Sequence, residues 1–135
     1  MQMTKELIRS YYDSFNRQDL ETFFSYLSDD IIHDINQGDS EIGKAKFVSF
    51  MNHMNHCYKE TVKDLVVMVN DDGARAAAEF IIEGTYLVTD KGLPEAKGQS
   101  YQLPVGAFFS IKNGKITRVS NYYNLQEWLK QVEKW

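Results

Sequence analysis

The chain has 135 residues, enough for one domain with a buried core, and 25% of them are charged, as in ordinary globular proteins. The formal net charge is −4 and the charges are interspersed, so the basic face typical of a nucleic-acid-binding protein is not visible. The single cysteine excludes an internal disulfide and favours a reducing compartment. Neither a signal-peptide pattern nor a bilayer-length apolar run is evident, so we expect a soluble, cytoplasmic protein that binds neither nucleic acid nor membranes.

Helical patterns dominate the N-terminal part, where apolar residues recur three and four positions apart. The first predicted helix begins at Thr4, which can cap it, and ends near Phe15. The second follows Asp19, another capping residue, and extends to Leu27. A third is predicted from about residue 43 to residue 56.

Beyond Tyr58 the apolar pattern changes to one typical of strands. The dipeptides Asp72-Gly73 and Asn113-Gly114 each predict a tight hairpin turn that connects two successive strands. A terminal helix begins after Asn124, which can cap it, and its apolar stripe reaches Trp135. The strands predicted in this half are 62–69, 76–88, 101–111 and 116–123.

Two of these strands carry further information. In the strand at 76–88, Glu79 and Glu83 share the face opposite Phe80, so we expect both glutamates on the surface. The strand at 101–111 contains Pro104 and Gly106, which predict an edge position or a bulge.

One further strand is predicted between the second and third helices, where β-branched residues surround an imidazole that lies next to a carboxylate. Successive strand residues face opposite ways, so His33 shares a face with Ile31 and Ile35, and Asp34 lies on the other face. If the His33 face is the core side, this strand places a titratable group among apolar side chains. A histidine in such a place is either a hydrogen-bonded core residue or an acid–base group, and both readings stay open.

The order of the predicted elements indicates an α+β fold, because runs of helices are followed by strands in hairpins. The simplest packing is one domain over residues 1–135 in which a curled antiparallel sheet wraps around the helices. The result is a cone-shaped, cystatin-like roll, and a cone of this size can hold a small molecule.

Four segments resemble the nuclear transport factor 2-like superfamily and, within it, the ketosteroid-isomerase-related, SnoaL-like group. They are Phe15–Asp19, Leu27–Asp30, Gly43 at the start of a helix, and Asn113–Ile116. The resemblance covers essentially the whole chain and implies the same roll. It leaves the activity open, because the superfamily includes isomerases, cyclases, dehydratases, hydrolases and non-enzymes.

Carried over residue by residue, the resemblance implies a modified catalytic centre. Tyr11 falls at the position of the tyrosine oxyanion donor of the ketosteroid isomerases. The general-base aspartate of these enzymes is replaced by Ile35, and their protonated aspartic acid by Ala107. Asn121 and Tyr123 match the inward position of the acidic residue on the sheet of the SnoaL-like cyclases. Classical steroid isomerisation is therefore not what the resemblance predicts.

These observations define a candidate site, with His33 as the acid or base and with Tyr11 and Asn121 as polarising donors. Aromatic side chains that we expect to line the pocket and contact a ligand are Tyr86, Tyr101, Phe109, Tyr123 and Phe80.

A metal site has weaker support in the sequence. His53 and His56 lie three apart on the third predicted helix, with Cys57 following, and that spacing can chelate a metal. No further ligand is apparent nearby, so we assign no metal and no cofactor.

Two functions remain open at this point. One is cofactor-independent, isomerase- or lyase-like proton transfer on a hydrophobic carbonyl compound, which the inward histidine favours. The other is a non-catalytic ligand-binding or scaffold protein of the same fold, which the missing aspartates favour. Under either function the outer surface of a curled sheet favours a homodimer.

Overall fold

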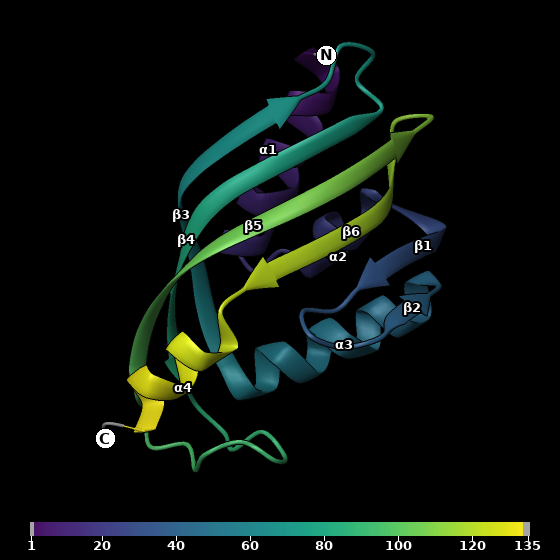
Figure 1. The fold of residues 1–135 in the computed structure, drawn as a ribbon. Helices are drawn as coiled ribbons and strands as arrows, with labels where there is room; N and C mark the ends of the chain where they lie inside the picture. Colours follow the sequence, from purple (N-terminus) through teal and green to yellow (C-terminus); the bar gives the residue numbers. More distant parts are fainter. Residues whose placement is uncertain (1, 134–135) are drawn as a thin grey trace.

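The structure is a computed structural model that describes residues 2–133, and its helices and strands follow the predicted order with one strand added (Figure 1). The helices are α1 (Gln2–Asn16), α2 (Leu20–Ser25), α3 (Lys44–Cys57) and α4 (Leu125–Glu133). The strands are β1 (Leu27–Asp34), β2 (Ser40–Ile42), β3 (Tyr58–Val69), β4 (Arg75–Tyr86), β5 (Ser100–Lys112) and β6 (Lys115–Tyr123).

All six strands belong to one curled, open sheet in the order β2-β1-β6-β5-β4-β3. Neighbouring strands are antiparallel except β1 and β6, which are parallel. This parallel pair joins the N-terminal strand to the C-terminal one and aligns His33 with Val119. In Figure 1, α1 lies behind the long strands, on the inner side of the curl, and α3 lies below β6 and β1 in the view. The α+β fold with a sheet curled around helices is therefore confirmed.

Helix α1 packs on the inner side of the sheet because its apolar stripe buries Ile8, Tyr11 and Phe15. The last residue of α1, Asn16, makes two hydrogen bonds to the backbone of Val62 on β3. Asn16 Nδ2 donates to the carbonyl oxygen at 2.9 Å, and the amide of Val62 donates to Asn16 Oδ1 at 2.8 Å. This pair of bonds fixes the end of α1 against the strand.

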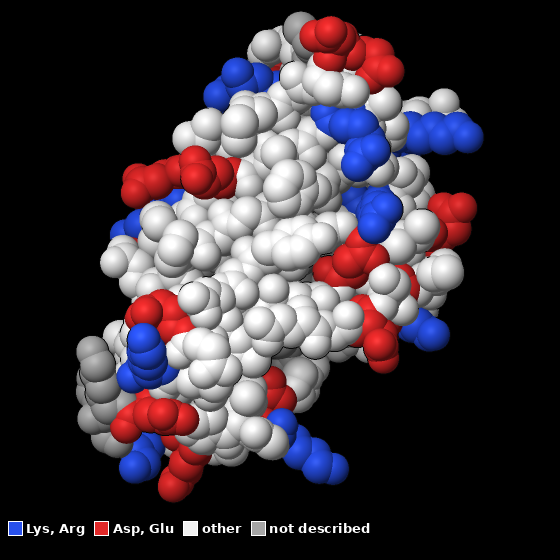
Figure 2. Space-filling model, in the orientation of Figure 1, with Lys and Arg blue, Asp and Glu red and all other residues white. Residues whose placement is uncertain are grey.

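Strand alternation separates an inner from an outer face as predicted. On β4, Phe80 is buried and Glu79 is exposed. On β1, His33 is buried on the inner face, whereas Asp34 accepts hydrogen bonds from Ser120 and Arg118 on the other side of the strand. The view of Figure 2 shows a broad uncharged surface over the sheet with charged side chains mostly around its edges.

Three local expectations change in the structure. Thr4 lies inside α1, which already begins at Gln2, so its hydroxyl donates to the carbonyl oxygen of Gly73 at 2.7 Å instead of capping the helix. The segment 40–42 forms β2 because a turn folds it back antiparallel onto β1. Pro104 lies in a central strand, but in the part of β5 beyond the pairing with β6, so no ladder bond to β6 is lost there. The predicted stripe residue Trp135 lies outside the described residues.

Candidate functional site

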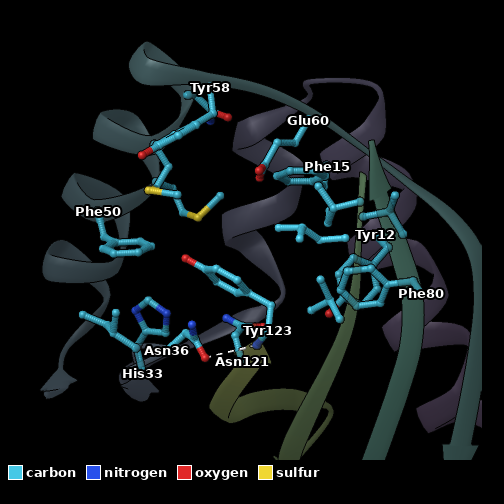
Figure 3. Close-up of a pocket in the computed structure, with 18 of the residues that line it drawn as sticks. Tyr12, Phe15, His33, Asn36, Phe50, Tyr58, Glu60, Phe80, Asn121 and Tyr123 are labelled. Carbon is cyan, nitrogen blue, oxygen red and sulfur yellow. Dashed lines mark hydrogen bonds between the residues drawn. The ribbon is translucent and has the colours of Figure 1, made fainter. Parts of the chain in front are cut away.

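A cavity of about 170 Å³ lies between the inner face of the sheet and the helices α1 and α3. Most of its lining is apolar, with Phe47, Phe50, Met51 and Met54 contributed by α3. Figure 3 shows the few polar groups among these side chains, with His33 at one end and Glu60 at the other. A cavity with this lining suits an apolar ligand that carries one or two polar groups.

His33 reaches the cavity from β1 and is 2% exposed. Its ring lies 4.7 Å, between centroids, from each of the rings of Phe47 and Phe50. Burial lowers the pKa of His33 below its ordinary value, and the carboxylates of Glu41 and Asp34 oppose this effect. Nδ1 of His33 has no hydrogen-bond partner among the described residues. The imidazole is therefore held neutral, with one buried ring nitrogen free for a ligand.

Glu60 is the second titratable group of the cavity, and it stands between Tyr58 and Val62 on the inner face of β3. Burial raises the pKa of its carboxyl group, and a hydrogen bond from Tyr101 opposes the rise. The Tyr101 hydroxyl donates to Glu60 Oε2 at 2.6 Å. Within residues 2–133 no ion pair neutralises this carboxylate. Its environment therefore favours the protonated acid.

The contact between Tyr101 and Glu60 depends on a glycine. Glu60 pairs with Gly84 across the β3–β4 ladder, and Gly84 pairs with Tyr101 across the β4–β5 ladder. Because Gly84 has no side chain, the tyrosine ring can lie over it; a Cβ at this position would be 2.3 Å from Tyr101 Cζ. The row of three strands thus brings a phenol to a carboxyl group two strands away.

Further polar groups lie between the two ends of the cavity. Asn36 Oδ1 accepts a hydrogen bond from the backbone amide of Tyr123 at 3.1 Å, and Asn36 Nδ2 has no partner among the described residues. Nδ2 of Asn55, on α3, is also buried without a hydrogen-bond partner among the described residues. The hydroxyl of Tyr123 points into the cavity (Figure 3). Because burial raises the pKa of Tyr123, this hydroxyl stays protonated and can donate a hydrogen bond. Buried polar atoms without partners are rare in proteins and indicate a place for a ligand or an ordered water.

The structure brings five of the predicted site residues to this cavity: His33, Tyr11, Asn121, Tyr123 and Phe80. Burial also raises the pKa of Tyr11, so its phenol stays protonated. Ile35, which replaces the general-base aspartate, also lines the cavity. Ala107, which replaces the protonated aspartic acid, is fully buried in the core.

Three residues expected in the pocket, Tyr86, Tyr101 and Phe109, lie on the inner face but outside the cavity lining. The Tyr86 hydroxyl is occupied, since it donates to the carbonyl oxygen of Pro94 and accepts from the amide of Asp90. Phe109 packs against the two tyrosines of α1. The expectation that all three face one cavity is corrected, because helices and loops fill both ends of the curled sheet.

Sequence reasoning missed Glu60, although a signal was present. Tyr58 and Val62 are both inward residues of one strand, so strict alternation also places Glu60 inward.

Comparison with known proteins identifies the family. Residues 8–119 match the SnoaL-like domain, and the chain belongs to this family. Its structure is similar to those of three proposed polyketide cyclases. The protein from Pseudomonas putida KT2440 is 56% identical, with 96% of this chain and 97% of that chain covered and a TM-score of 0.94. The protein from Xanthomonas campestris pv. campestris is 51% identical, with 97% of both chains covered and a TM-score of 0.94. The protein from Silicibacter sp. TM1040 is 49% identical, with 98% and 96% covered and a TM-score of 0.95.

No curated protein matches the chain. Within residues 2–133, no helix has the length and apolar character needed to cross a membrane.

Proposed function

We propose that this protein binds a small, mainly apolar carbonyl compound in the cavity and catalyses cofactor-independent proton transfer on it, as a cyclase or isomerase. The observation that carries the proposal is the pair of titratable groups at opposite ends of one apolar cavity, His33 and Glu60. Burial lowers the pKa of His33 and raises the pKa of Glu60. Environments that shift two pKa values in these opposite senses favour a base and an acid near neutral pH.

In the proposed reaction neutral His33 removes a proton from the carbon next to the carbonyl group and leaves an enolate. For a cyclase, that carbon forms a bond to a second carbonyl carbon of the same molecule, and Glu60 gives its proton to the oxygen of the second carbonyl. His33 then releases its proton to solvent, and Glu60 takes up a proton from solvent, so both groups return to their starting states. Tyr11, Tyr123 and Asn121 line the cavity, and in the proposed reaction their phenol and amide groups donate hydrogen bonds to the carbonyl oxygen.

The size of the cavity bears on the substrate. An engineered protein cavity of about 150 Å³ holds benzene. At about 170 Å³ the present cavity therefore suits a compound of about one ring. A larger substrate requires displacement of Met51 and Met54, whose flexible side chains line the α3 wall. The name of the relatives, polyketide cyclase, describes chemistry of the class proposed here.

We further propose that two copies of the chain associate in the cytoplasm through the outer face of the sheet. Phe108 and Tyr122 lie there with their ring centroids 5.7 Å apart, and they are 49% and 56% exposed. Val66 and Met68 are each 51% exposed on β3. An apolar surface with a charged rim is typical of a protein interface.

The proposal is tested with a short linear diketone that can close into a ring by an intramolecular aldol reaction. His33→Gln and Glu60→Gln should each lower the rate of ring closure by roughly 10²–10⁴-fold, the usual contribution of a general acid or base. His56→Gln and Glu79→Gln make the same changes at exposed positions and should keep the wild-type rate. Ring closure that survives both cavity variants would overturn the mechanism.

The second candidate function is a ligand-binding protein without catalysis, and the replacement of both aspartates by Ile35 and Ala107 favours it. It predicts that the diketone or cyclohexanone binds, as measured by calorimetry, while no ring closure or proton exchange above the buffer rate is observed.

A further inference from the structure

A cluster of metal-ligating side chains lies outside the cavity, at the C-terminal end of α3. His53 and Cys57 are four residues apart on α3 and so lie on one face of the helix. The structure adds Asp90, from the segment between β4 and β5, as a third member. His53 Nε2 lies 2.8 Å from Asp90 Oδ1 and 3.9 Å from Cys57 Sγ. The three ligand atoms all lie within 4.8 Å of one another.

Hydrogen bonding within the cluster accounts for only part of this arrangement. The same ring nitrogen of His53 faces both a carboxylate oxygen and a sulfur, and it can satisfy one of them at a time. If Nε2 carries a proton it donates to Asp90, and the thiol of Cys57 is left without that acceptor. A cation between the three atoms would interact with all of them at once.

Surrounding contacts hold the carboxylate of Asp90 and the backbone at Cys57 in place. Tyr58 Oη donates to Asp90 Oδ2 at 2.8 Å, which leaves Oδ1 directed at the cluster. The backbone amide of Leu87 donates to the carbonyl oxygen of Cys57 at 2.7 Å, so the segment that carries Asp90 is bonded to the end of α3. Such partners of the ligands orient metal sites in proteins.

We propose that His53, Cys57 and Asp90 bind a zinc ion. A nitrogen, a sulfur and an oxygen ligand suit Zn²⁺, and the thiolate disfavours Mg²⁺ and Ca²⁺. Zn–N and Zn–S bonds of about 2.1 and 2.3 Å in a tetrahedron place nitrogen and sulfur about 3.6 Å apart. The observed nitrogen–sulfur distance of 3.9 Å is a few tenths of an ångström longer than this, whereas the nitrogen–oxygen distance of 2.8 Å must open to roughly 3.4 Å, so the side chains of His53 and Asp90 move apart when the ion binds. Among residues 2–133 the cluster has three members, so a water molecule takes the fourth position.

Zinc at this site would connect α3 to the segment between β4 and β5 at the rim of the cavity. Leu93, three residues after Asp90, lines the cavity, and so does Tyr58. Binding displaces the proton of the Cys57 thiol and fixes the segment against α3. The side chain of His53 is 54% exposed, so the ion has a path from solvent.

The test uses the full chain without a histidine tag, stripped of metal with a chelator and titrated with Zn²⁺ and then with Co²⁺. We expect one Zn²⁺ per chain by calorimetry, a melting temperature several degrees higher with zinc, and a thiolate-to-cobalt absorption band in the near ultraviolet. Cys57→Ser should abolish the band, and Asp90→Asn should weaken zinc binding. Tyr58→Phe should weaken it by roughly 10–100-fold, the usual effect of removing a partner of a ligand.

The matched control is His56→Gln, which changes a neighbouring exposed histidine of the same helix and should bind zinc as the wild type does. Zinc binding that is equally tight in wild type, Cys57→Ser and Asp90→Asn would overturn the proposal. So would the lack of any effect of zinc on the melting temperature of the wild type.

Discussion

Substitution of Gly84 by alanine should break the contact that positions Glu60. The new Cβ would lie 2.3 Å from Cζ and 2.5 Å from Oη of Tyr101, whereas ordinary contact begins near 3.4 Å. The tyrosine ring must therefore retreat by roughly 1 Å, which stretches its hydrogen bond of 2.6 Å to Glu60 beyond the bonding range. Crowding of this kind costs about 1–3 kcal/mol, and the lost hydrogen bond about 1 kcal/mol more. We expect a total loss of about 2–4 kcal/mol in the free energy of unfolding by urea.

The loss should also depend on pH. Tyr101 holds the pKa of Glu60 down, so its retreat raises that pKa further. A carboxyl group whose pKa is raised in the folded state favours folding while protonated, and this stability is lost as pH rises above its unfolded value, near 4.5. Gly84→Ala should therefore cost more stability at pH 8 than at pH 4, and in a Glu60→Gln background the difference should vanish. A cost that is the same at both pH values and in both backgrounds would refute the reasoning.

Three further predictions concern other parts of the molecule. Asn16→Ala removes both hydrogen bonds to Val62 and should lower the free energy of unfolding by about 2 kcal/mol, as measured with urea; an unchanged midpoint would contradict the role given to Asn16. Hydrogen bonds from Ser120 and other partners lower the pKa of Asp34 to about 2 from 3.8, so its stabilisation is present above pH 3.8 and lost as pH falls towards 2. Asp34→Asn should cost about 1 kcal/mol at pH 7, since its ion-pair partner Arg118 is 49% exposed and water screens the pair, and progressively less in acid; a cost independent of pH would contradict this. Phe108→Glu should convert a dimer to a monomer by light scattering, and a monomeric wild type at micromolar concentration would contradict the proposed interface.

Much of the fold could be predicted from the sequence because periodicity and turn chemistry determine it locally. Alternation on β1 correctly separates His33 from Asp34, and the turn at Asn113-Gly114 has both residues at positive φ, as the sequence predicts. The parallel pairing of β1 with β6 could not be predicted this way, because it depends on contacts between segments far apart in the chain.

The site could be predicted only in part. Alternation shows which face a side chain takes, but not how far the cavity extends along that face. The sequence therefore predicts Tyr86 in the lining, although packing keeps it out. Asp90 lies in a segment without periodic pattern, and only the folded chain brings it to His53. Strand alternation is enough to predict that Glu60 faces inward. It does not predict that Glu60 contacts Tyr101 across Gly84, because that contact depends on the pairing of three strands.

The central claim is that His33 acts as the base in an apolar cavity, and the pH dependence of proton exchange tests it most directly. Cyclohexanone, a single ring matched to the cavity, is incubated with the protein in D₂O, and loss of its α-proton signal is followed by NMR. Because burial lowers the pKa of His33, the rate should rise with one deprotonation below the ordinary histidine value of 6.5 and stay level above it. His33→Gln should remove this rate at every pH, whereas an unchanged rate in His33→Gln would contradict the account.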